Sequence, residues 1–145
     1  MTTSRRDFIL ARAAATAIDV GVAAAAYVAV AILSALAGAI NFGFANFLGW
    51  VAVVASIAAF LFNTGYLQAA SGQSVGKRKT GLQVLSEDGT RATPGQIWGR
   101  AGVDLVCLLT IGVLFLIDRV VALTRPDLRR PTDFALRTKV LEVAR

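Results

Sequence analysis

Hydrophobic residues fill two long stretches of the chain, and a short uncharged turn separates them. Between Asp19 and Lys77 the sequence contains no Asp, Glu, Lys or Arg. A gap of this length is enough for two membrane crossings, because about 20 apolar residues span the hydrocarbon core of a bilayer. The pattern therefore predicts one transmembrane helix over about residues 13–39, a turn over 41–47 and a second transmembrane helix over about residues 48–67.

Small residues recur at four-residue spacing in the first predicted helix. The pairs are Gly21 and Ala25, Ala25 and Ala29, Ala31 and Ala35, and Ser34 and Gly38. Because small side chains let helix backbones approach closely, this stripe predicts a helix–helix contact. The contact could serve folding, self-association or the binding of a partner, and the sequence does not distinguish these.

A more polar loop over about residues 68–96 follows the second predicted helix. It contains the motif Gly-Gln-Ser-Val-Gly-Lys-Arg at residues 72–78. This motif differs from a nucleotide-binding P-loop, because only three residues separate the glycines and no Ser or Thr follows the Lys. Residues 81–86 alternate like a short strand, residues 87–89 are typical of a turn, and residues 90–92 can form a return strand. The loop is expected to form a small β-hairpin on the cytoplasmic surface of the membrane.

A third apolar segment, over about residues 101–122, is shorter, and a basic tail over residues 123–145 follows it. Arg100 and Asp104 are four residues apart, so they can pair on one helix face. A third crossing would put the basic tail outside, against the positive-inside rule, so the segment either spans against that rule or re-enters with a break near Gly112. The fold class we expect is an all-α membrane protein. It would have two long transmembrane helices, a third shorter spanning or re-entrant helical segment, and a small cytoplasmic β-hairpin-like loop.

Composition and charge agree with a membrane protein that is not an enzyme. The chain is 56% hydrophobic, with a mean hydropathy of +0.64. Its net charge of +6 is concentrated at the N-terminus, in the central loop and in the tail, which suits a membrane surface rather than nucleic acid. There is no His, and the single Cys107 lies in an apolar run. These absences disfavour a disulfide, a metal site or a nucleophile–base pair, and we expect no cofactor.

The basic N-terminus also predicts the orientation of the chain. Under the positive-inside rule it places that end in the cytoplasm. The abundance of Arg and Ala indicates a GC-rich bacterial genome, such as that of an actinobacterium. We therefore expect a multi-pass protein of the bacterial inner (cytoplasmic) membrane, in contact with membrane lipids.

Arg12 and Asp19 place two opposite charges in the first predicted helix. Residues seven apart lie two turns apart on nearly the same face, about 10 Å along the axis. Arg12 can reach the headgroups by snorkelling, whereas a lone carboxylate at the depth of Asp19 costs a few kcal/mol. Two interpretations stay open: an ion or proton site, or a structural Asp that fixes how helices meet.

Three ordered blocks make the chain resemble the RDD family of membrane proteins. The first block runs from Arg12 to Asp19 and resembles the family's arginine at the start of helix 1 with an aspartate inside it. The second contains Gly72, Gly76 and Lys77, and is similar to the family's Gly-Gln-x-x-Gly-Lys loop. The third runs from residue 129 to residue 140 around Asp133. The resemblance covers nearly the whole chain.

The resemblance implies a shared cluster of charges. Asp133 would be the second family aspartate, and Arg12, Asp19 and Asp133 would meet at the inner membrane boundary with Arg12 shared between the two carboxylates. The tail would then return to the cytoplasmic side. The family usually has His before this aspartate, whereas this chain has Thr132, so a role that needs a titrating histidine does not transfer to it.

These features favour an accessory or scaffolding subunit of a larger membrane complex. Such a subunit needs small-residue helix faces, a basic surface and little chemistry of its own. For relatives in GC-rich actinobacteria, the resemblance implies companions of lipid importers of the mammalian-cell-entry (Mce) type. The expected partner is therefore a larger membrane complex, with a lipid importer permease as the specific candidate.

Two alternative functions are retained. One is a cation/proton antiporter, an activity attributed to some relatives, in which Asp19 and Asp104 would exchange a proton for a cation. The other is a membrane module whose basic tail senses anionic lipid.

Overall fold

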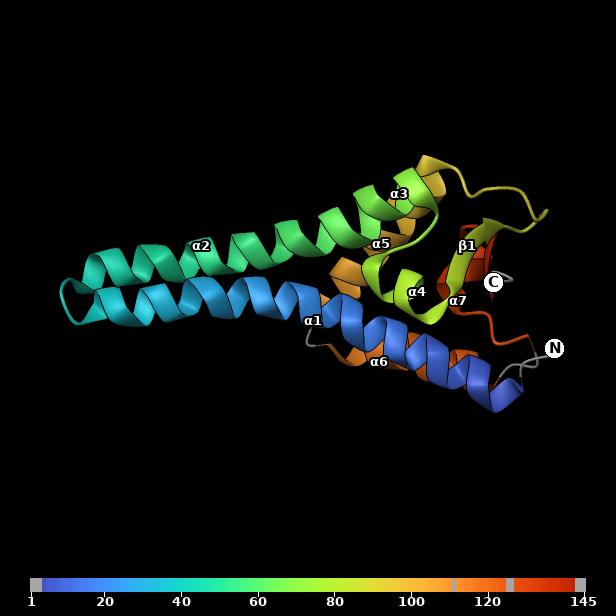
Figure 1. Cartoon of the computed structure of the whole chain (residues 1–145), viewed down its shortest axis with the longest axis horizontal. Coiled ribbons are helices and arrows are strands. Elements are labelled where there is room, and N and C mark those ends of the chain that lie inside the picture. The colour runs from blue at the N-terminus through green and yellow to red at the C-terminus, as the bar shows by residue number, and fades with distance from the viewer. Residues whose placement is uncertain (1–3, 111, 125–126, 143–145) are drawn as a thin grey trace.

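The computed structural model describes residues 4–110, 112–124 and 127–142. Two antiparallel helices, α1 (Arg5–Gly38) and α2 (Phe42–Leu61), form a long rod, and the other elements gather in a smaller head at one end of it (Figure 1). The 34 residues of α1 correspond to about 50 Å of helix. This length exceeds the roughly 30 Å hydrocarbon core of a bilayer, and the N-terminal turns of α1 lie beside the head.

Capping residues set the ends of the rod helices. Helix α1 begins eight residues before the predicted start at residue 13, because Ser4 Oγ accepts a hydrogen bond from the Asp7 N–H at 3.2 Å. At the far end of the rod, Asn41 Oδ1 accepts a hydrogen bond from the Phe44 N–H at 2.9 Å and starts α2. These two caps satisfy backbone donors that a helix cannot satisfy by itself.

The two helices of the rod are joined by small residues and hydroxyl groups. Ser34 Oγ donates to the Ala45 carbonyl at 2.7 Å, and Ser56 Oγ donates to the Ala23 carbonyl at 3.1 Å. This part of the predicted stripe therefore serves folding. The other part faces outward, where three small residues are exposed: Gly21, Ala25 and Ala29.

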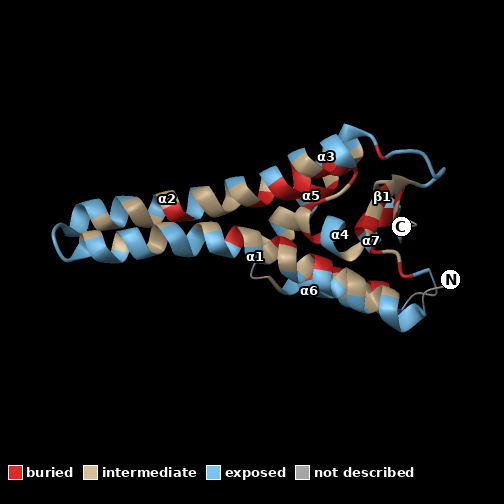
Figure 2. Cartoon of the chain, in the orientation of Figure 1, coloured by how far each residue is buried: buried red, intermediate tan, exposed pale blue. Residues whose placement is uncertain are grey.

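Both helices of the rod are long and apolar enough to cross a membrane. One candidate span is α1, and the other is the continuous helix Phe42–Ser71. Only 6% of the most apolar window of α1 and 11% of that of the second helix are buried inside the molecule. Most of the rod surface is accordingly exposed (Figure 2). Apolar surface on this scale needs a lipid or protein environment.

The second long helix changes its winding before it ends. After α2 it continues as a π-helix, η1 (Phe62–Leu67), and as the short α3 (Gln68–Ser71). The wider turn lies where Asn63 and Thr64 are buried. Gly65 lets Trp98 approach, since a Cβ at this position would come within 2.7 Å of the indole ring.

A strand from the tail completes the small sheet of the head. The head contains α4 (Val75–Thr80), β1 (Leu82–Ser86), α7 (Pro131–Ala135) and β2 (Thr138–Glu142). Strands β1 and β2 are antiparallel with Val84 opposite Val140, so the predicted partner of β1 was wrong. Residues 90–92 contribute only an isolated bridge between Arg91 and Leu85. Val84, Val140 and Ile97 pack in the buried core of the head.

The third apolar segment folds back on itself. Helix α5 (Pro94–Leu109) starts with a capping box between Thr93 and Gln96, and α6 (Val113–Thr124) follows a break at Gly112, whose φ is +69°. Left-handed backbone of this kind suits glycine. The two helices form a hairpin held by the contact of Arg119 with Asp104, so the segment is broken near Gly112 as the sequence predicted. The tail therefore returns to the end of the molecule where α1 begins (Figure 1).

Candidate functional site

The first cluster surrounds Asp19, which is 95% buried on α1. Its Oδ1 accepts hydrogen bonds from Asn63 Nδ2 and from the Gly76 N–H, both at 2.8 Å. Its Oδ2 accepts a hydrogen bond from Ser74 Oγ at 2.6 Å and lies 3.9 Å from Lys77 Nζ. We call these five residues the Asp19 cluster.

The Gly-rich motif brings the start of α4 against α1. Ser74 caps α4, and the Asn63 Oδ1 accepts a hydrogen bond from the Val75 N–H at 2.8 Å. A Cβ at Gly76 would lie 2.0 Å from the Ala15 carbonyl oxygen. Only glycine permits this approach, so the second glycine of the motif has a packing role.

The first glycine of the motif has a different role. Gly72 ends α3 with φ +79°, a left-handed conformation that favours glycine. Its carbonyl accepts a hydrogen bond from the Val84 N–H at 3.1 Å. The motif thus reverses the chain between the second long helix and the head, without forming a phosphate cradle.

Lys77 is the cation of the Asp19 cluster. Its Nζ donates a hydrogen bond to Gln68 Oε1 at 2.6 Å. Burial lowers the pKa of Lys77 to about 8, although the nearby carboxylate of Asp19 acts in the opposite direction. The ammonium group is therefore held in a site where loss of hydration disfavours its charged form.

The second cluster surrounds Asp133, which is completely buried at the first turn of α7. Arg100 binds its Oδ1 and also Thr138 Oγ1. Arg12 Nη2 lies 3.4 Å from its Oδ2, and the Arg130 N–H donates to the same oxygen at 3.1 Å. We call these five residues the Asp133 cluster.

Charge compensation in the Asp133 cluster is strong. Burial by itself raises the pKa of the Asp133 carboxyl, but the charges of Arg100, Arg130 and Arg12 outweigh it and hold the pKa well below its ordinary value. The carboxylate is therefore ionised and shared between three guanidinium groups.

A third group of charges links α5, α6 and the tail. Arg130 Nη1 lies 3.1 Å from Asp104 Oδ1 and 3.4 Å from Asp118 Oδ2. Arg119 Nη2 lies 3.4 Å from Asp104 Oδ2. Thr132 Oγ1 donates to Asp118 Oδ1 at 2.8 Å, so the position where the family usually has His is a hydrogen-bond donor here. We call these five residues the Asp104 cluster.

The structure separates residues that were expected to form one cluster. Arg12 binds Asp133 but not Asp19, whose cationic partner among the described residues is Lys77. The predicted sharing of Arg12 between both carboxylates was wrong, because two turns of helix keep Asp19 about 10 Å from Arg12 along the axis.

The expected pair within α5 was also wrong. Arg100 binds Asp133, whereas Asp104 binds Arg119 and Arg130. Side chains four apart on a helix can meet, but here partners from other elements give each buried charge a closer contact.

Sequence reasoning missed several members of these clusters. Asn63 had a signal, because it is an amide within an apolar helix, where polar groups are costly unless they are bonded. Asp118 and Arg119 ended the third apolar segment, and their partners in the tail had no local signal.

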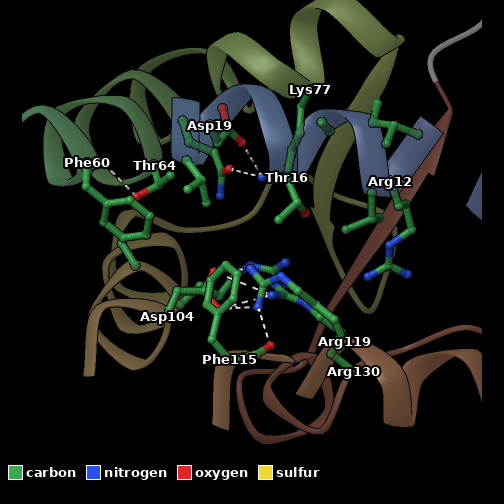
Figure 3. A pocket seen from close by; sticks show the side chains of 17 residues that line it. Arg12, Thr16, Asp19, Phe60, Thr64, Lys77, Asp104, Phe115, Arg119 and Arg130 are labelled. Carbon is green, nitrogen blue, oxygen red and sulfur yellow. Dashed lines mark hydrogen bonds and ion pairs between the residues drawn. The ribbon is translucent and has the colours of Figure 1, made fainter. Parts of the chain in front are cut away.

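A cavity lies between the Asp19 cluster and the other two clusters (Figure 3). Its volume of about 60 Å³ is enough for a few water molecules or a small ion. Its wall contains more cations than carboxylates. The charged lining residues are Arg12, Lys77, Arg100, Arg119 and Arg130, with Asp19 and Asp104.

The carboxylates of the three clusters are paired with cations. The four carboxylates of the clusters, Asp19, Asp104, Asp118 and Asp133, each lie within 4 Å of at least one Lys or Arg nitrogen. Within the described residues, no group of three or more His, Cys, Asp or Glu side chains has the arrangement of a metal site.

Comparison with known proteins identifies the family. No curated protein and no solved structure matches the chain. The model of the RDD family matches residues 8–137, which is most of the chain and includes every member of the three clusters except Thr138. This match confirms the resemblance that the three sequence blocks indicated. With two helices that are able to span a membrane, the chain belongs to the RDD family of membrane proteins.

Proposed function

We propose that the chain is a non-enzymatic accessory subunit of a larger membrane complex, which binds its partner through the outward face of α1. The observation that carries this proposal is the exposure of Gly21, Ala25 and Ala29 on a helix whose apolar surface is almost entirely unburied. Small residues permit close helix packing inside a membrane. Since α2 does not cover these positions, they are available to a helix of another protein.

The charged head supports the same function. The Asp133 and Asp104 clusters tie α1, α5, α6 and the tail together through buried ion pairs. Such contacts fix the relative positions of the elements, since breaking one of them leaves a buried charge without its partner. The head would act as a rigid base that presents α1 in one orientation.

The same contacts favour the accessory function over cation exchange. Asp19 accepts hydrogen bonds from three donors, and Asp104 lies against Arg119 and Arg130. A cation would have to displace these partners and enter a cavity in which cations outnumber carboxylates among the charged lining residues. Electrostatic repulsion opposes that step.

The basic tail also has internal partners. Arg130 is buried against Asp104, and Arg129 Nη1 lies 2.9 Å from Glu87 Oε1. These arginines are used to hold the head together, which disfavours a tail that acts as a free sensor of anionic lipid.

The test is purification of the tagged full chain from its own membranes in mild detergent, with identification of the chains that copurify. We expect one stoichiometric, larger membrane protein, and a lipid importer permease of the Mce type is the specific partner that we propose. Gly21→Leu is expected to abolish copurification, because the added side chain fills the contact surface. A Cβ at this position meets nothing within 4 Å in this chain.

Ala58→Leu is the matched control, since Ala58 is an exposed small residue on α2. It is expected to retain the partner. Recovery of the chain alone, or as an oligomer of itself, would overturn the accessory function. Equal recovery of the partner with both variants would overturn the assignment of the α1 face.

A further inference from the structure

A second cavity, of about 160 Å³, forms an apolar slot between α1 and α6. Ile9 and Ala13 line it from α1, and Leu116 and Val120 line it from α6. Three arginines, Arg12, Arg119 and Arg130, line both this slot and the polar cavity. The slot therefore combines an apolar wall with an end next to three cationic residues, called here its cationic end.

The cationic end contains more positive than negative charge. The ion-paired clusters hold five cations, Arg12, Lys77, Arg100, Arg119 and Arg130, against four carboxylates, Asp19, Asp104, Asp118 and Asp133. Within the described residues, one positive charge in these clusters is left over. An uncompensated charge in a buried network is costly and attracts a counter-ion.

Two hydrogen-bond donors at this end also lack acceptors. Arg130 is 94% buried, and its Nε has no acceptor in the described structure. The buried Nε of Arg119 is in the same condition, and the Arg119 guanidinium reaches Asp104 only at 3.4 Å. Buried N–H groups normally have partners, so an acceptor-rich anion fits this place.

The opening of the slot indicates the kind of anion. Leu116 is 62% exposed and Val120 is 56% exposed, although both line the slot. The α6 surface around them also carries exposed Val113 and Ile117. In a membrane protein, such a surface faces acyl chains. A ligand that enters here needs an apolar chain as well as a negative charge.

We propose that this slot binds one anionic phospholipid, with its phosphate against Arg119 and Arg130 and a segment of one acyl chain along Ile9, Leu116 and Val120. The volume suits part of one chain, and the rest of the lipid stays in the bilayer. Guanidinium groups are well matched to phosphate oxygens. The phosphate supplies the missing negative charge.

The test measures thermal unfolding of the full chain in an uncharged detergent with added lipid. Phosphatidylglycerol is expected to raise the unfolding midpoint, because a ligand of the folded state stabilises it. Phosphatidylcholine and inorganic phosphate at the same concentration are expected to have at most a small effect. Equal shifts with both lipids would overturn the proposal, and an equal shift with inorganic phosphate would assign the site to a free anion instead.

Two variants locate the site. Ala13→Phe fills the slot with an apolar side chain and leaves every charge in place, so we expect at least tenfold weaker binding of phosphatidylglycerol. Ala14→Phe is the control, because Ala14 is also exposed on α1 but does not line the slot. Equal lipid binding by the two variants would place the lipid elsewhere. The lipid comparison on the unmodified chain tests the proposal even if one variant does not fold.

Discussion

Replacing Gly76 by alanine tests the contact that joins the Gly-rich motif to α1. A Cβ at this position would lie 2.0 Å from the Ala15 carbonyl oxygen and 2.9 Å from Asp19 Oδ1. Both neighbours are fixed, because one belongs to the backbone of α1 and the other is bound by three donors. Since ordinary contact begins at 3.4 Å, α4 has to retreat by more than an ångström.

The cost of this retreat follows from the contacts that it breaks. The Gly76 N–H, now 2.8 Å from Asp19 Oδ1, moves beyond hydrogen-bonding distance. Losing a hydrogen bond to a buried charge costs about 1.5–3 kcal/mol, and overpacking adds about 1–3 kcal/mol. The greater helix propensity of alanine returns at most about 1 kcal/mol. We therefore expect Gly76→Ala to lower the free energy of unfolding by about 2–5 kcal/mol.

The assay is thermal unfolding of the full chain in mild detergent, followed by circular dichroism. At roughly 2–4 °C per kcal/mol, the midpoint is expected to fall by about 5–15 °C. Gly21→Ala is the matched control, because a Cβ there meets nothing within 4 Å. It is expected to leave the midpoint unchanged or slightly higher. Equal midpoints for the two variants would refute the inference that α1 and α4 require glycine at this contact.

Three further predictions concern the charged clusters. Asp133→Asn is expected to destabilise the chain by about 3–5 kcal/mol in the same melts, because it leaves buried arginines without their carboxylate partner. The control is Asp127→Asn, at an exposed position. Similar losses of stability in the two variants would contradict this reasoning. Thr132→Val keeps the shape but removes the hydroxyl that donates to Asp118, so a loss of about 1.5–3 kcal/mol is expected, and a wild-type midpoint would argue against it. The pKa of Lys77 is about 8 in the folded chain, whereas its ordinary value is 10.5. Between these two pH values the unfolded chain binds more protons than the folded chain. The free energy of unfolding is therefore expected to rise with pH over this range by up to about 3 kcal/mol. Lys77→Met should remove that rise. Denaturant titrations that show the same dependence of stability on pH for the wild-type chain and the variant would exclude the titration of Lys77 as the cause.

The rod was predictable because its signal is local. The absence of charge between Asp19 and Lys77 defines two apolar helices without reference to any other part of the chain. The break at Gly112 was also foreseen, since glycine and the basic tail together disfavoured a simple third crossing. Periodicity and charge patterns of this kind report on neighbouring residues.

The pairing of elements was harder to predict, because it depends on residues that are distant in the sequence. The turn at residues 87–89 indicated a local return strand. Strand β1 instead pairs along its whole length with residues 138–142, and this pairing buries Val84 opposite Val140. A strand pattern does not identify its partner.

The same limit applies to the candidate site. Arg12, Asp19 and Asp133 were all identified as site residues, yet the single cluster that the family resemblance implied was wrong. Neither a sequence motif nor spacing within one helix tells which elements pack together. Lys77 of the loop is the cation beside Asp19, and Arg100 of α5 forms an ion pair with Asp133. Three-dimensional packing decided which charges meet.

The distance along the chain between ion-pair partners has a consequence for biosynthesis. The ion-pair partners Arg12 and Asp133 are 121 positions apart, and the hydrogen-bond partners Asp19 and Ser74 are 55 apart. At a translation rate of about 5–20 residues per second, α1 is made several seconds before its partner groups exist. During this interval its charges must remain near the membrane surface or bear the cost of the bilayer. A chain that ends before residue 133 therefore lacks the carboxylate that pairs with Arg12 in the complete fold.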